Sequence, residues 1–121
     1  MPTLAFHVVE SARGDVGRAL RDVVRGTWSV AAPVVSAEGV ITWEIPAAGT
    51  VTVEDDVALY WEARELVLRI ADASLELEAE VEADIDGELM GTIANGTVDD
   101  GIGTGLLAEW QNELVRRGAT L

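Results

Sequence analysis

Residues 75–86 (LELEAEVEADID) alternate between apolar and acidic side chains without a break. Successive side chains of a β-strand point to opposite faces of a sheet, whereas those of an α-helix return to the same face about every 3.6 residues. The pattern therefore predicts a β-strand with one apolar face and one face of carboxylates. Because an apolar face must be buried, we expect a second layer of structure to pack against it.

A partner strand is predicted directly before this segment, joined to it by a turn at Asp72-Ala73. In the expected register Ile70 lies opposite Leu75 and Arg69 lies opposite Glu76. Apolar side chains then meet on one face, and opposite charges meet on the other. This agreement favours the register over one that is shifted by a single residue.

The other elements are predicted from periodicity and from capping residues. Ser11 is expected to cap an amphipathic helix that ends at Gly26, and Thr104 a final helix that ends at Gly118. Asp86-Gly87 is a strong hairpin signal. Further strands are expected at residues 3–10, 28–35, 40–45, 50–54, 57–63 and 88–94.

This order of elements predicts a single α+β domain over residues 1–121. We expect a curved antiparallel sheet of about six to eight strands, covered by an N-terminal and a C-terminal helix. The order resembles the helix-grip fold of START and polyketide-cyclase-like proteins across the whole chain. That resemblance implies a bent sheet that wraps around the C-terminal helix and encloses an apolar cup.

The charge of the chain is strongly unbalanced. Aspartate and glutamate number 22 against 8 basic residues, all of them arginine, and the net charge is −14. Such a surface repels nucleic acids and anionic membranes and favours a basic partner protein. A high-salt habitat is the alternative explanation, since salt screens repulsion between carboxylates. The chain lacks cysteine, a basic leader and an apolar run long enough to span a bilayer, so we expect a cytoplasmic protein.

Four tryptophans stand against one phenylalanine and one tyrosine. Large rings with a polar N–H suit the walls of a ligand cup. Trp43, Trp61 and Trp110 are therefore candidate ligand-binding residues, and the alternative is that they fill a small core. His7 is the single histidine and joins the candidate set, with a structural, hydrogen-bonded role as its alternative.

Three functions remain open from the sequence. The leading hypothesis is a non-enzymatic domain that holds an apolar small molecule or lipid between the sheet and the last helix. The second is an acidic interaction module, comparable to an immunity-type inhibitor of a basic toxin or nuclease. The third is a cyclase- or isomerase-type enzyme that uses His7 or a carboxylate, although no catalytic residue is identified.

No cofactor or metal is expected. Residues 82–87 match the start of an EF-hand calcium loop, but Ile93 stands where that loop needs its final acidic ligand. A homodimer is also possible. Arg18, Arg21 and Arg25 form a cationic stripe on the first predicted helix that could face the carboxylates of a second copy, and the alternative is pairing with neighbouring aspartates.

Overall fold

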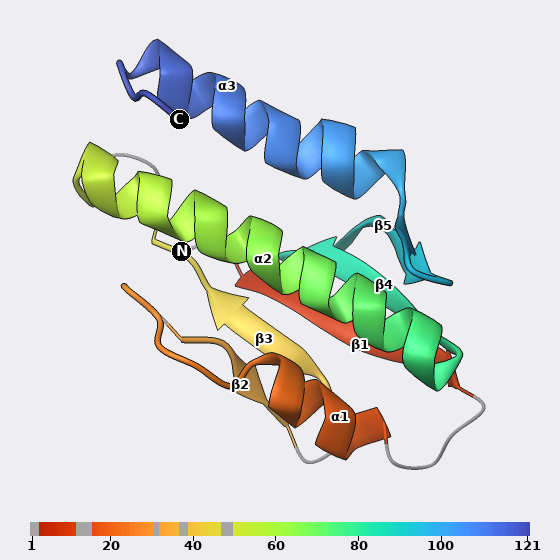
Figure 1. Ribbon diagram of the computed structural model, residues 1–121. Helices are drawn as coiled ribbons and strands as arrows, with labels where there is room; N and C mark the ends of the chain where they lie inside the picture. Colours follow the sequence, from red (N-terminus) through yellow and green to blue (C-terminus); the bar gives the residue numbers. More distant parts are fainter. Residues whose placement is uncertain (1–2, 12–15, 31, 37–38, 47–49) are drawn as a thin grey trace.

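The structure is a computed structural model that describes residues 3–11, 16–30, 32–36, 39–46 and 50–121 (Figure 1). Within these ranges the elements follow the order β-α-β-β-α-β-β-β and then a helical C-terminal part. Their bounds are β1 Thr3–Ser11, α1 Val16–Val23, β2 Val34–Val35, β3 Ile41–Glu44, α2 Val53–Leu77, β4 Ala79–Ile85, β5 Glu88–Ala94, β6 Thr97–Val98, the π-helix η1 Gly101–Leu107 and α3 Ala108–Arg116.

The strands form one antiparallel sheet in the order β2-β3-β1-β4-β5-β6. The N-terminal strand β1 lies in the middle, paired with β3 on one side and with β4 on the other. Leu4 lies opposite both Trp43 and Ile85, and Val8 lies opposite Val81. The expected α+β class and the antiparallel sheet are thus confirmed in the described part of the chain.

The helices lie on one side of the sheet, and α2 runs across its middle strands (Figure 1). The core forms between this helical layer and the inward face of the sheet. Its largest fully buried side chains are Trp43 and Phe6. The same cluster contains residues of α1, α2, η1 and the central strands: Leu4, Phe6, Leu20, Ile41, Trp43, Leu59, Ala63, Leu66, Val67, Ile70, Ala71, Val81, Ala83, Ile93 and Ile102.

The strands predicted at 50–54, at 57–63 and directly before the turn at Asp72-Ala73 are wrong, because residues 53–77 form the single helix α2. Thr52 caps this helix, its hydroxyl oxygen accepting a hydrogen bond from the N–H of Asp55 at 3.2 Å. Acidic residues fill the first turn, where they stabilise the positive end of the helix dipole. Buried residues then recur every three or four positions, as a helix covering a sheet requires.

The alternating segment that predicted one long strand is divided between two elements. Leu75 belongs to α2 and is 61% exposed, whereas Val81 belongs to β4 and is 2% exposed. The change occurs at Glu78, which adopts the left-handed conformation with φ of 50° and ends the helix. Only residues 79–85 are the predicted strand, and the register with Ile70 and Arg69 does not exist.

The other boundaries differ in smaller ways. Ser11 ends β1, five positions before α1 begins at Val16, so it is not the helix cap. The strand predicted at 28–35 shrinks to Val34–Val35. Thr104 lies inside η1 and donates its hydroxyl hydrogen to the carbonyl of Asp100 instead of capping a helix. The hairpin at Asp86-Gly87 is confirmed, with φ of 51° and 84°.

Gly101 allows η1 to approach the sheet closely. A Cβ at this position would lie 2.0 Å from the carbonyl oxygen of Met90, whereas a Cβ at Gly103 in the same π-helix would meet nothing within 4 Å. Backbone cannot move aside as a flexible side chain can, so the position accepts only glycine.

Gly101→Ala should therefore destabilise the fold by about 2 kcal/mol or more, since it forces β5 and η1 apart. The matched variant Gly103→Ala should be neutral or slightly stabilising, because it restricts the unfolded chain without a clash. Urea unfolding followed by circular dichroism measures both. Equal stabilities of the two variants would contradict the close packing described here.

Candidate protein-interaction surface

The second face of the sheet is not covered by any helix in the described part of the chain. Strand alternation sends every other side chain to this face, and the pairing aligns them in rows. We call the surface the open face. It consists of Thr3, Ala5 and His7 of β1, Val34 of β2, Thr42 and Glu44 of β3, Glu80, Glu82 and Asp84 of β4, and Leu89, Thr92 and Ala94 of β5.

His7 lies near the middle of the open face, between two carboxylates of the neighbouring strand. Its Nε2 is 3.3 Å from Oε2 of Glu82, and its Nδ1 is 3.5 Å from Oδ1 of Asp84. The His7 side chain is 37% exposed, and that of Asp84 is 20% exposed. Oδ1 of Asp84 is nevertheless buried and accepts no hydrogen bond from the residues described. It is an acceptor that lacks a well-aligned donor.

The described arginines are confined to one of the two layers of the molecule. The open face carries the carboxylates of Glu44, Glu80, Glu82 and Asp84. The arginines whose placement is described lie on the helices or directly after them: Arg18, Arg21, Arg25, Arg64, Arg69, Arg116 and Arg117. Each arginine ion pair found there joins residues of the helical layer. None of the described arginines therefore pairs with the carboxylates of the open face.

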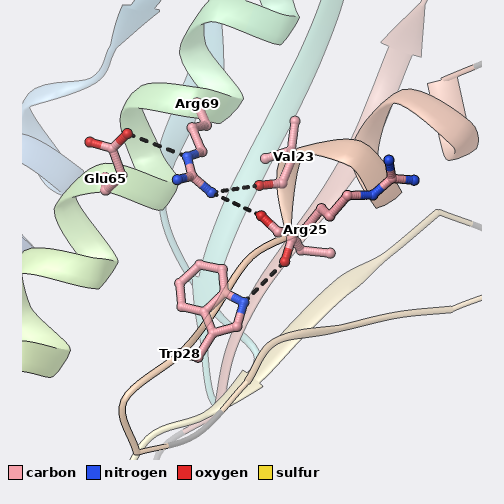
Figure 2. A network of polar contacts seen from close by, with 6 residues as sticks. Val23, Arg25, Trp28, Glu65 and Arg69 are labelled. Carbon is pink, nitrogen blue, oxygen red and sulfur yellow. Dashed lines mark hydrogen bonds and ion pairs between the residues drawn. The ribbon is translucent and has the colours of Figure 1, made fainter.

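Arg69 connects α2 to the end of α1 (Figure 2). Its NH1 donates to the carbonyl oxygens of Val23 and Arg25, both at 3.3 Å, while its Nε lies 3.3 Å from Oε1 of Glu65. Trp28 donates its indole N–H to the carbonyl of Val24 at 3.0 Å. Carbonyls at the end of a helix lack partners within the helix, so these donors fix the position of α1.

Asp56 connects the start of α2 to the end of α3. Its carboxylate accepts a hydrogen bond from the indole N–H of Trp110 at 3.2 Å and forms an ion pair with Arg117. The Asp56 side chain is 8% exposed and that of Arg117 is 23% exposed, so water replaces little of this contact. A buried carboxylate with two charge-assisted or polar donors holds the two helices together.

The structure separates the residues that the sequence put forward as one site. Trp43 is fully buried in β3, where its ring meets that of Trp28 edge to face at 5.5 Å. Trp61 and Trp110 both contact Tyr60, with ring centroids 5.3 and 5.9 Å away. His7 belongs to the opposite face of the sheet from Trp43.

Tyr60 and Asp56 were missed because the segment around them was assigned to strands. The signal that could have found them is Thr52 followed by Glu54, Asp55 and Asp56, which is typical of a helix start. Surface grooves occur on the helical layer. One of about 510 Å³ lies along α3, and one of about 430 Å³ lies between α1 and α2.

Comparisons with family models, curated proteins and solved structures found no match to this chain. None of the described helices is both long and apolar enough to cross a membrane. Among the residues placed by the structure, no three His, Cys, Asp or Glu side chains are arranged to hold a metal ion.

Replacing Asp56 by alanine should cost about 3 kcal/mol of stability, because it leaves a half-buried guanidinium and an indole N–H without their acceptor. Asp55→Ala is the matched control. Asp55 lies in the same first turn of α2 but is exposed, so its loss tests the helix dipole alone and should cost only a small fraction of that value. Thermal or urea unfolding of both variants measures the difference, and similar losses would show that the contact with α3 adds nothing.

Proposed function

We propose that this protein is a non-enzymatic interaction module whose open face binds a basic partner protein, in the manner of an immunity-type inhibitor. The distribution of the arginines supports this proposal. All the described arginines lie on the helical layer, together with many carboxylates, whereas the open face has carboxylates and no described arginine. A basic partner would therefore meet no arginine of the described residues on this face.

The chemistry of the open face suits the side chains of such a partner. An arginine can place two N–H groups on a carboxylate, and Glu80, Glu82 and Asp84 follow one another along the open face of β4. Apolar contacts are available in the same row, because Leu89 lies opposite Asp84 and is exposed. Acidic groups around a few apolar anchors resemble the rim and core of a protein interface. The net charge of −14 would speed the encounter by electrostatic steering.

An apolar ligand in a helix-grip cup receives less support. The space between the sheet and α2 is filled by core side chains, and Trp43 is fully buried among them. A ligand beside Trp43 would therefore have to displace core side chains. Of the three candidate tryptophans, only Trp61 and Trp110, which both contact Tyr60, could then contact an apolar ligand.

The enzymatic alternative depends on His7. Its contacts with Glu82 and Asp84 could orient an imidazole base, but these residues lie on the open face, whereas the two grooves described above lie on the helical layer. A homodimer in which the exposed arginines of α1 meet a second copy's open face is an alternative occupant of the same surface. Arg25 already pairs with Asp22 at 3.0 Å, which lowers its availability.

The test removes charge from one layer at a time. In one variant Glu80→Gln, Glu82→Gln and Asp84→Asn neutralise the open face. In the other, Glu54→Gln, Asp55→Asn and Glu109→Gln remove the same net charge from exposed positions of the helical layer. Each variant is immobilised and used to capture proteins from a native lysate. The affinity of the captured basic partner for each variant is then measured at low and at high salt.

We expect the open-face variant to lose at least about tenfold in affinity at low salt, with a weaker dependence on salt. The helical-layer variant should lose less than about threefold, because its charges act only at long range. Equal losses of affinity in the two variants would show that only the net charge matters, and they would contradict a specific binding surface. Loss of binding when Arg18, Arg21 and Arg25 are replaced, together with a change in native mass, would favour the homodimer.

A further inference from the structure

A stripe of apolar side chains runs along the outer surface of α2. Trp61, Leu68 and Leu75 are 44%, 49% and 61% exposed, and they follow one another at intervals of seven residues. Seven residues make almost two helical turns, so the three side chains lie in line and cover about 21 Å. Because the core contacts of α2 use its opposite side, this stripe contributes nothing to the core of the fold.

The stripe is accessible between the neighbouring helices. In Figure 1, α3 lies along one side of α2, and α1 lies beside the C-terminal half of α2 on the other side. Trp61 contacts Tyr60 and lies under the guanidinium of Arg64, 5.2 Å from the ring centroid. Its ring is thus held in place while nearly half of its surface stays open. Less side-chain conformational entropy is therefore lost when a partner binds.

The spacing indicates the shape of the partner. A repeat of seven is the interval at which two packed α-helices stay in contact along their length. An extended strand or a loop would have no reason to match it. The stripe therefore suits an amphipathic helix that presents large aliphatic side chains at the same interval.

The charges beside the stripe indicate the chemistry of that helix. Glu65, Asp72 and Glu76 are exposed on the side of the stripe that faces α1. Asp72 and Glu76 also line the groove between α1 and α2, where the third carboxylate, Asp22, is already paired with Arg25. The rest of this groove of about 430 Å³ is lined by apolar residues and by Arg69, whose guanidinium is bonded to carbonyl oxygens of the α1 end and to Glu65. Long arginine or lysine side chains can lay their stems in such a groove and pair with Asp72 and Glu76.

An antiparallel second copy of this chain fits the stripe poorly. If two α2 helices met antiparallel around Leu68, Glu65 of each would approach Asp72 of the other, because these residues lie on the same side of the stripe. If they met parallel, each flank of the stripe would face the opposite flank of the partner, so that Arg64 would approach Glu65 of the other copy. Like charges therefore disfavour the antiparallel pair, whereas the parallel pair is tested by the native mass of the protein.

We infer that the outer face of α2 is a second docking site, distinct from the open face, which takes an amphipathic α-helix with an apolar heptad stripe and a basic flank. With both surfaces in use the protein would contact its partners from opposite sides of the molecule. The basic flank lies over the groove between α1 and α2, and the apolar stripe covers Trp61, Leu68 and Leu75.

The test uses a labelled synthetic peptide of about three heptads, with leucine at every seventh position and arginine along one flank. Fluorescence anisotropy measures its affinity for the full chain. We expect saturable binding that weakens at least about tenfold in the variant Leu68→Ser, because the central contact is lost. The control Val115→Ser changes an equally exposed aliphatic residue on α3 and should alter affinity less than about twofold. A peptide with glutamate in place of the arginines should bind at least about tenfold more weakly.

Three results would overturn the inference. The first is no saturable binding of the arginine peptide, and the second is an equal effect of Leu68→Ser and Val115→Ser. The third is a native dimer, seen by sedimentation, that dissociates in Leu68→Ser, since a second copy would then be the occupant. The peptide should bind the open-face triple variant with unchanged affinity, so failure here and failure of the proposed function are separate outcomes.

Discussion

The burial of one face of the β1–β4 pair under α2 is the interaction on which the rest of the molecule depends. β1 is central in the sheet, and its inward side chains Leu4 and Phe6 are buried with those of α2. A strand has only two faces, so burying one leaves the other for solvent or a partner. Placing every helix on the buried side leaves the carboxylates of β4 on the other. The open face is therefore a direct consequence of how the core forms.

The helices are held to one another by a few polar contacts at helix ends. Arg69 fixes the last carbonyls of α1, and Asp56 fixes Trp110 and Arg117 beside the start of α2. Both contacts lie at helix ends, where backbone N–H and C=O groups lack partners within the helix and the helix dipole carries its partial charges. This use of arginine within the helical layer also explains why these cations do not reach the carboxylates of the open face. The same arrangement thus stabilises the fold and keeps these arginines away from the open face.

Prediction from the sequence succeeded for the strands that alternate and failed where alternation crossed a helix end. Val81 and Ala83 are buried and Glu82 is outward, as the apolar and acidic pattern indicated. Leu75 and Leu77 continue the same pattern but belong to α2. Two or three alternating residues at a helix end look the same as the start of a strand, because the helical period needs several turns to become visible. Trp43 lies on a strand and Trp110 on a helix as predicted, but the strand predicted for Trp61 is part of α2.

The sequence by itself determined the α+β class, the acidic outer face of residues 79–85 and the turn at Asp86-Gly87, because each follows from local periodicity or from backbone conformations that few residues adopt. Only the tertiary structure decided that residues 53–77 are one helix, that Trp43 is sealed in the core while Trp61 stays exposed, and that His7 lies between Glu82 and Asp84. These features arise from contacts between segments far apart in the chain. A pattern of neighbouring residues does not show which face of a sheet will be buried by such contacts. It also does not show whether they will stabilise a helix or a strand.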